Sequence, residues 1–130
     1  MSNSFNLEII TPAETVLKTQ TTEAIIPAFE GIMTILKDHI SLITFLRPGL
    51  IEVKVNGNFE KYYVEEGTVE FSDNNLLILT STAKDLKNFD KNSIENLLEN
   101  AEKKFKDVNT TDKEKYIISH KIDILKEIKK

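Results

Sequence analysis

The chain has 130 residues, of which 40% are hydrophobic, and this length suits one globular domain or one domain with an appendage. Its net charge of −4 argues against nucleic acid as the main partner. It contains no cysteine, which excludes a disulfide framework, a thiol nucleophile and a thiolate metal site. No apolar run approaches the roughly 20 residues that span a bilayer, and residues 1–5 lack the features of a secretion signal. We therefore expect a soluble, intracellular protein without direct membrane insertion.

Short apolar runs in the first two thirds of the chain, several of them alternating with polar residues, show the pattern of β-strands. The expected strands cover residues 5–9, 23–26, 33–36, 50–55, 59–64, 69–71 and 76–79. Asn56-Gly57 tolerates the positive φ values of a type I′ turn and predicts a β-hairpin. The polar segment 72–75 predicts a second hairpin. Short strands joined by tight turns indicate an antiparallel β-sandwich or barrel.

The last third of the chain changes to the three- and four-residue spacing of amphipathic helices. Asp90 is expected to cap a first helix. The apolar stripe of this helix is Ile94, Leu97, Leu98, Ala101, Phe105 and Val108. Thr111 and Glu114 form a capping box, in which each side chain bonds the backbone N–H of the other, and they start a second helix. Its apolar stripe is Ile117, Ile118, Ile122, Ile124, Leu125 and Ile128.

The change in periodicity divides the chain into residues 1–87, a predicted β-sandwich, and residues 88–130, a predicted antiparallel αα-hairpin. The charge balance changes near the same point. Residues 1–89 carry 12 acidic and 7 basic side chains, whereas residues 90–130 carry 9 acidic and 10 basic ones. A lone two-helix hairpin buries too little surface to be firmly stable, so its apolar stripes need a partner. The sequence pattern leaves open whether that partner is the sandwich, the hairpin itself or another protein.

His39, with Asp38 before it and Ser41 after it, is the one candidate catalytic site. Neighbouring residues on a strand or loop usually point apart, whereas the members of a triad must converge in space. His120 is the only other histidine, and no metal-ligand spacing such as H-x₃-H occurs. The four glycines are spread one per turn and form no phosphate-binding loop. A turn or interface histidine is therefore favoured, with no catalytic residue and no metal site.

Lysines are enriched in the second helix. Residues 111–130 carry six lysines against four acids, which favours an acidic partner surface. Over both helices together the acidic residues nearly cancel the lysines, so a solvated charged face is the simpler interpretation.

Several segments carry a resemblance to a known family, and together they cover essentially the full length. They are residues 5–12, Glu30-Gly31, Ile35-Leu36, His39, Leu42, Pro48-Gly49, residues 67–71, and Ile78-Leu79 before Ala83. On these segments the chain resembles the epsilon subunit of bacterial F-type ATP synthases, which is called delta in mitochondria. The resemblance implies an α+β fold, with an N-terminal antiparallel β-sandwich of about ten strands followed by a C-terminal two-helix antiparallel hairpin.

The role implied by the resemblance is non-catalytic. The family's subunit sits on the central stalk of the proton-translocating ATP synthase, bound to the gamma subunit and the c-ring, and couples ring rotation to the catalytic head. The resemblance thus implies a peripheral location in this ATP-synthesis and ion-transport complex, on the cytoplasmic face of the bacterial inner membrane. By position, Glu30, Gly31 and Ile32 match the loop that faces the c-ring, and His39 falls near gamma.

The resemblance also implies a hypothesis about regulation. In many bacteria the hairpin extends along gamma, contacts the alpha and beta subunits of the head transiently and blocks ATP hydrolysis. The corresponding candidate residues here are Lys113, Lys115, Lys121 and Lys126. Some members bind ATP through an Ile-Asp-x-x-Arg-Ala motif, of which only Asp90 matches, since Ser93 and Ile94 replace the arginine and the alanine. We expect weak or no ATP binding and no cofactor.

Two alternatives come from other classes of protein. A small-ligand-binding β-sandwich would place converging polar groups around an interior pocket, whereas the expected inward positions are mainly aliphatic. An enzyme centred on Asp38 and His39 would lose turnover in a His39→Ala variant, whereas a stalk subunit would show only weakened assembly.

Overall fold

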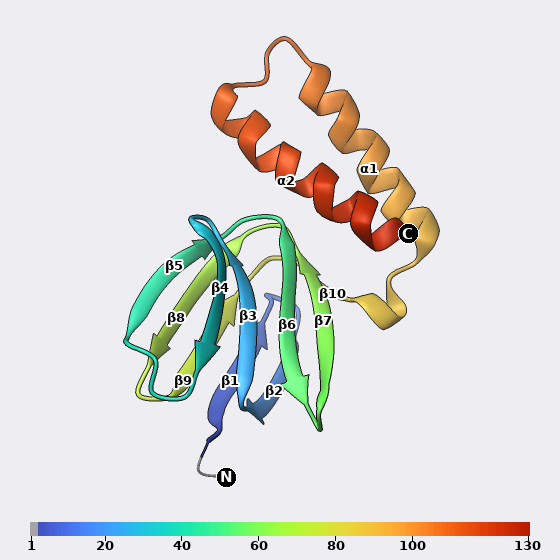
Figure 1. Ribbon diagram of the computed structural model, residues 1–130. Helices are drawn as coiled ribbons and strands as arrows, with labels where there is room; N and C mark the ends of the chain where they lie inside the picture. The colour runs from blue at the N-terminus through green and yellow to red at the C-terminus, as the bar shows by residue number, and fades with distance from the viewer. Residues whose placement is uncertain (1–2) are drawn as a thin grey trace. The chain divides into compact units, whose positions relative to one another are not determined.

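The computed structural model describes residues 3–130 and contains ten β-strands, one 3₁₀ turn and two α-helices (Figure 1). The strands are β1 (Phe5–Ile10), β2 (Thr15–Thr21), β3 (Glu23–Ala28), β4 (Gly31–Leu36), β5 (Leu42–Leu46), β6 (Gly49–Val55), β7 (Asn58–Val64), β8 (Gly67–Ser72), β9 (Asn75–Leu79) and β10 (Ala83–Asp85). The helical elements are η1 (Leu86–Asn88), α1 (Lys91–Lys106) and α2 (Asp112–Lys129). Met1 and Ser2, with which the predicted 1–87 unit begins, lie outside the described residues. The chain divides into two compact units between Leu86 and Lys87.

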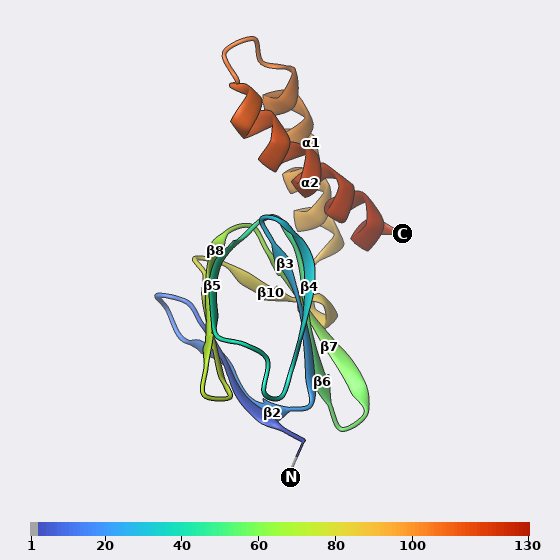
Figure 2. The same cartoon turned by 60° about the vertical axis from the view of Figure 1, so that its left-hand side comes forward.

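The strands form two layers (Figure 2). One layer has the order β10-β7-β6-β3, with β4 paired to β3, and the other has the order β5-β8-β9-β1-β2. The predicted sandwich and its two-helix appendage are thereby confirmed. Among the pairs of described strands, β1 and β9 run parallel, and the rest are antiparallel.

The two layers are joined by backbone hydrogen bonds at one corner. Ala28, the last residue of β3, pairs with Leu46, the last residue of β5. The N–H of Phe29 donates to the carbonyl oxygen of Phe45 at 2.8 Å, which extends the junction by one residue. The hydrogen-bond ladder therefore continues from one layer into the other.

Inward-facing side chains from both layers fill the space between them. The core consists of Phe5, Leu7, Ile9, Ala24, Ile26, Ala28, Ile35, Leu46, Ile51, Val53, Tyr62, Val64, Val69, Phe71, Leu76 and Ile78. The rings of Phe5 and Phe71 meet edge to face, with their centroids 5.6 Å apart. Burial of each large aliphatic or aromatic side chain contributes about 1.5–3 kcal/mol, so this core is the main source of the sandwich's stability.

Tight turns confirm both predicted hairpins. Asn56 and Gly57 have φ values of 51° and 83° and join β6 to β7. Asp73 and Asn74 have φ values of 49° and 60° and join β8 to β9. A type I′ turn needs positive φ at both central positions, which glycine, asparagine and aspartate tolerate better than other residues.

Three strands were not among those expected from alternation. β2 mixes threonine, lysine and glutamine with two apolar residues, and β10 has only three residues, held by pairing with β7. β5, with the sequence Leu-Ile-Thr-Phe-Leu, has apolar side chains on both faces, so a period of two is hidden. Pairing with neighbouring strands, rather than local pattern, specifies these elements.

The two helices pack against each other as the predicted antiparallel hairpin (Figure 1). The buried residues are Ile94, Leu98 and Ala101 in α1 and Ile118 and Leu125 in α2, all of which belong to the predicted stripes. Within residues 3–130, no helix combines the length and apolar character that a bilayer crossing needs.

Two details of the first helix differ from the prediction. Val108 lies beyond α1, which ends at Lys106 because Asp107 adopts an extended conformation with a ψ of 129°, and Val108 is almost fully exposed. Asp90 occupies the N-cap position, but its carboxylate bonds no backbone N–H of the first turn. It accepts a hydrogen bond from the hydroxyl of Ser93 at 3.4 Å instead, which explains why it does not cap.

Candidate functional site

Hydrogen bonds and a ring contact hold Asp38 and His39 in their turn. Asp38 has a φ of 65°, and its N–H donates to Oδ1 of Asn74 at 2.7 Å. In return, Nδ2 of Asn74 donates to Oδ1 of Asp38 at 2.9 Å. Nδ1 of His39 donates to the carbonyl oxygen of Ile40 at 2.7 Å, and the imidazole meets the ring of Phe71 edge to face.

These contacts give no support to an enzyme centred on this pair. The hydrogen bonds described for the Asp38 carboxylate and the His39 ring lead to different partners, so no Asp–His dyad forms. Among the residues that the structure describes, no three histidine, cysteine, aspartate or glutamate side chains are grouped as a metal site. The turn instead ties the β4–β5 connection to the β8–β9 hairpin.

The predicted ring-facing residues lie at the other end of β4. Glu30 precedes the strand, Gly31 begins it with a φ of 149°, and Ile32 is largely exposed. His39 follows the strand's far end, and a six-residue strand is about 20 Å long. The structure therefore separates the two predicted contact regions by the length of β4.

A buried threonine holds the Glu30 side chain. The hydroxyl of Thr44 in β5 donates to Oε1 of Glu30 at 2.8 Å. This hydrogen bond lowers the pKa of Glu30 from its ordinary value of 4.5, because it stabilises the ionised carboxylate. The loop thus presents a fixed negative charge beside the exposed Ile32.

Replacing Thr44 by valine should raise the pKa of Glu30 toward 4.5. A depressed pKa in the folded state adds stability above the unfolded-state value, and that stability is lost as the pH falls through the folded-state value. The variant should therefore lose less stability than the parent in this acidic range. Carboxyl NMR titration measures the pKa directly. Thr68→Val, on an exposed position of β8, is the control, and an unchanged Glu30 pKa in Thr44→Val would contradict this assignment.

A second surface is not among those that the sequence predicts. Ile43 and Phe45 in β5 and Leu79 in β9 are 75%, 63% and 43% exposed, although all three are large hydrophobic side chains. Phe45 and Leu79 both pair with Thr68 of β8, from either side, so they share one row on the outer face of the sheet. We call Ile43, Phe45 and Leu79 the outer patch. The signal in the sequence was β5 itself, because a strand with one solvated face should alternate with polar residues.

The sandwich interior offers no support for a small-ligand site. Hydrophobic side chains fill the core, and among the described residues every buried side-chain nitrogen and oxygen has a hydrogen-bond partner. One surface depression of about 430 Å³ lies beside Leu79, lined also by Ile10, Pro12 and Gly67. It borders the outer patch and opens to solvent.

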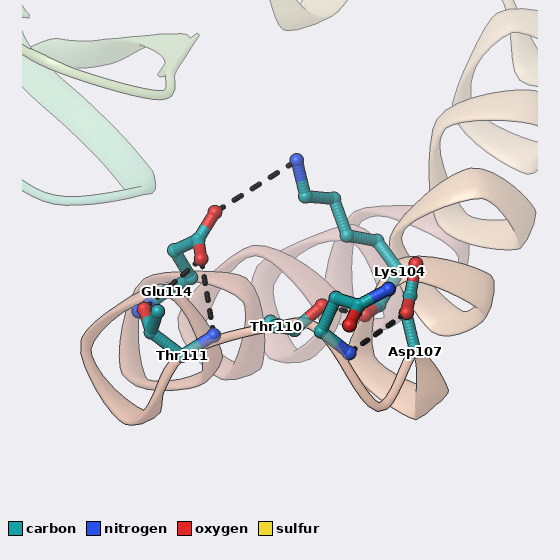
Figure 3. A network of polar contacts seen from close by, with 6 residues as sticks. Lys104, Asp107, Thr110, Thr111 and Glu114 are labelled. Atoms are coloured by element: carbon teal, nitrogen blue, oxygen red, sulfur yellow. Dashed lines mark hydrogen bonds and ion pairs between the residues drawn. The ribbon is translucent and has the colours of Figure 1, made fainter.

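The end of α1 is held by bonds to the carbonyl oxygen of Lys104 (Figure 3). The N–H of Asp107 donates to it at 3.2 Å, and the hydroxyl of Thr110 donates at 2.7 Å. The carboxylate of Asp107 accepts a bond from the N–H of Asn109 at 2.9 Å. The bonds to Lys104 give a hydrogen-bond partner to a carbonyl group of the last helical turn, where such groups lack partners within the helix. Together the three bonds fix the path of the loop.

The start of α2 confirms the predicted capping box (Figure 3). The N–H of Glu114 donates to the hydroxyl of Thr111 at 3.2 Å, and the N–H of Thr111 donates to the Glu114 carboxylate at 3.0 Å. The bond from the Thr111 N–H lowers the pKa of Glu114, as does that from the Thr111 hydroxyl. Nζ of Lys104 lies 4.0 Å from the same carboxylate and links the two helices across the loop.

Removing the Thr111 hydroxyl with Thr111→Ala should destabilise the start of α2 by about 1 kcal/mol, because one N–H of its first turn loses its partner. Amide hydrogen exchange of residues 113–115 should speed up accordingly. Thr111→Ser keeps the hydroxyl and is the matched control, so it should behave like the parent. Equal exchange rates in the alanine and serine variants would show that the box contributes nothing to the helix.

The predicted inhibitory lysines all lie on α2, and two of them contact α1 side chains in the hairpin. Nζ of Lys126 is 4.0 Å from the Glu102 carboxylate. Nζ of Lys115 lies 5.9 Å from the centre of the Phe105 ring. Exposed pairs of this kind contribute about 0–1 kcal/mol each. They therefore stabilise the contact between α1 and α2 only weakly.

The comparisons with known proteins all indicate the same family. A family model described as the ATP synthase delta/epsilon chain, beta-sandwich domain, matches residues 4–85. The ATP synthase epsilon chain of Pelagibacter ubique (strain HTCC1062) is 48% identical over 127 residues, which cover 97% of this chain and 98% of the relative. The ATP synthase epsilon chain of Sinorhizobium medicae (strain WSM419) is 33% identical over 102 residues, or 78% of this chain and 76% of the relative.

Two solved structures share the fold. A chain in the OSCP/F1/c-ring structure of the Euglena gracilis mitochondrial ATP synthase has a TM-score of 0.74 at 22% identity and matches 95% of this chain and 78% of its own length. A chain in the central stalk and c-ring structure of the Tetrahymena thermophila mitochondrial ATP synthase has a TM-score of 0.62 at 15% identity, with 96% of each chain covered. The sandwich and the hairpin thus occur together in other proteins.

Proposed function

The chain belongs to the ATP synthase delta/epsilon family, and on this basis we propose that it is the non-catalytic epsilon subunit of the central stalk of a proton-translocating F-type ATP synthase. It binds the gamma subunit and the c-ring and couples ring rotation to the catalytic head. It lies on the cytoplasmic face of the bacterial inner membrane as a peripheral part of the complex. The observation that carries the proposal is the close match to an epsilon chain over nearly the full length of both proteins.

The outer patch is the surface that we assign to gamma. Isolated exposed hydrophobic residues are normal, but Ile43, Phe45 and Leu79 gather on one face of β5-β8-β9. Interfaces take their binding energy mainly from a few aromatic and aliphatic anchors of this kind. His39 lies in the turn directly before β5, and we assign it to the edge of the same gamma-binding surface.

The surface that we assign to the c-ring consists of Glu30, in the β3–β4 turn, and of Gly31 and Ile32, the first two residues of β4. Ile32 supplies an exposed apolar contact, and Glu30 supplies a carboxylate held in position by Thr44. A contact that transmits rotation needs side chains with fixed positions, since a mobile loop would yield before it moved the sandwich. The Thr44 hydrogen bond meets that need.

Co-purification with gamma tests the central-stalk role. The full chain, mixed with the gamma subunit of the same organism, should elute with it from a sizing column as a one-to-one complex. The same chain mixed with an unrelated protein of similar charge is the control. Separate elution of this chain and gamma at micromolar concentration would refute the role, whatever the hairpin does.

We further propose that the helical hairpin inhibits ATP hydrolysis. A hairpin with two docking states favours whichever state covers its apolar stripes better. In the extended state, lysines of α2 would reach acidic surface in the head. The candidates are Lys113, Lys115, Lys121 and Lys126. Lys126 would exchange its weak contact with Glu102 for one with the head.

Deletion of residues 90–130 should raise ATP hydrolysis by the purified complex several-fold, because the inhibitory element is removed. The measurement is the steady-state hydrolysis rate of complexes carrying the full or the shortened chain. Proton pumping driven by that hydrolysis should continue, because residues 3–86 hold the whole sandwich. An unchanged rate would exclude inhibition by the hairpin and leave the stalk role intact.

A further inference from the structure

The connection between β4 and β5, residues 37–41, crosses from one layer of the sandwich to the other. We call this segment the β4–β5 turn. The Asn74 side chain, 36 residues away in sequence, is bonded to it twice: it accepts from the Asp38 N–H at 2.7 Å and donates to the Asp38 carboxylate at 2.9 Å. Both bonds involve a single residue of the turn, so they fix its position and its orientation together.

The residue types suit this arrangement. Opposite the Asp38 carboxylate, the side chain at position 74 must both accept and donate, which an amide does and a carboxylate or an aliphatic side chain does not. Asp38 and Asn74 both adopt positive φ, at 65° and 60°, where aspartate and asparagine are tolerated. The pair therefore meets a side-chain requirement and a backbone requirement at the same positions.

A second contact holds the same turn. The imidazole of His39 meets the Phe71 ring edge to face at 6.0 Å between centroids, and Phe71 itself packs on Phe5 in the core. The backbone N–H of His39 also donates to the Leu36 carbonyl oxygen at 3.1 Å. The turn is thus anchored to the opposite layer through β8 and through the β8–β9 hairpin.

This anchored turn carries Ile40, whose carbonyl oxygen bonds the His39 ring but whose side chain stays exposed in the isolated protein. Ile40 is 79% exposed, and it lies three residues before Ile43 of the outer patch. An exposed isoleucine on an anchored turn that leads directly into β5 is suited to binding, because less entropy remains to be lost when the partner arrives.

We propose that Asn74 is a positioning residue for gamma: it fixes the β4–β5 turn so that Ile40 and the outer patch form one preformed docking surface. The inference rests on the proposed gamma partnership and adds to it a residue that does not itself need to touch gamma. Loss of the two bonds leaves the patch in place and leaves the turn held only by the His39 contacts, so the turn becomes more mobile and binding weakens without loss of the fold.

Three variants of the full chain test this role by titration calorimetry against purified gamma. Asn74→Gly removes both hydrogen bonds without backbone strain, and it should weaken binding by about tenfold, the effect of ordering a few freed side chains. Asn56→Gly makes the same change at the positive-φ position of the β6–β7 turn and should leave the affinity within twofold of the parent. The double exchange Asp38→Asn with Asn74→Asp keeps the net charge and restores a donor and an acceptor facing each other, so it should recover the parent's affinity.

Backbone NMR relaxation of residues 37–41 supplies a readout that does not involve gamma. These amides should become mobile in Asn74→Gly and rigid again in the double exchange. Parent-like affinity in Asn74→Gly, or failure of the double exchange to recover binding, would overturn the role of Asn74 and leave the gamma partnership standing. Failure of the parent chain to bind gamma would overturn both.

Discussion

Replacing Gly67 by alanine is expected to destabilise the sandwich by about 4 kcal/mol, a large part of the stability of a small domain. Gly67 begins β8 with a φ of 150°, which side chains rarely adopt. A Cβ atom there would lie 2.3 Å from the Leu79 carbonyl oxygen and 3.1 Å from Cα of Thr80. Both atoms belong to the backbone, and the Thr80 N–H is bonded to the Ile10 carbonyl oxygen. Moving them away from the new Cβ atom would therefore strain backbone hydrogen bonds.

Gly31→Ala is the matched control for this effect. Gly31 has nearly the same φ, 149°, but a Cβ atom on it would meet nothing within 4 Å. Gly31→Ala should therefore lower the free energy of unfolding only by the cost of the unfavourable φ, about 1–2 kcal/mol. Urea unfolding followed by the amide NMR signals of β8 and β9 measures both variants. Equal losses would show that the clash at Gly67 is relieved by a backbone shift.

Phe45→Glu is expected to weaken binding to gamma at least about 30-fold, because buried aromatic anchors contribute 2 kcal/mol or more to an interface. Phe45 points outward from β5 and is 63% exposed, so the substitution places a charge on the surface rather than in the core. The thermal stability of the isolated chain should hardly change. Calorimetric titration with gamma, together with a melting curve, separates the two effects.

Phe59→Glu provides the comparison. Phe59 is also an outward-facing, partly exposed phenylalanine, but it lies on β7, in the other layer. Both variants replace a partly exposed phenylalanine by glutamate and therefore add the same charge. If they weakened gamma binding equally, the outer patch would not be the specific contact, and non-specific repulsion would explain the result.

Local rules account for the parts of the fold that the sequence predicts. The alternation of Phe5, Leu7 and Ile9, the Asn56-Gly57 turn and the Thr111–Glu114 box each depend on residues a few positions apart. β2 and β10 depend on pairing instead, because β2 shows no regular alternation of apolar and polar residues and β10 has only three residues. Val108 continues the apolar spacing of α1 although Asp107 has already left the helix, so the sequence pattern extends beyond the observed end of α1.

The candidate surfaces also differ in how far the sequence predicts them. The roles of His39 in contact with gamma, and of Glu30, Gly31 and Ile32 in contact with the c-ring, follow from the resemblance alone and stay predictions. The bonds from Asn74 to Asp38 join positions 36 residues apart, so no local pattern reveals them. The outer patch could have been inferred from β5, where Ile43 and Phe45 occupy positions that a solvated strand gives to polar side chains.

The corner at which Ala28 pairs with Leu46 has a mechanical consequence. Glu30 and Gly31 lie within three residues of this corner, at the end of the sandwich that the ring is proposed to touch. A twisting force applied there would enter both layers at once through hydrogen bonds, instead of passing from one to the other across the side chains of the core. The two layers would then share the load as a single elastic shell, which resists sliding of one sheet over the other and delivers the torque with little lag.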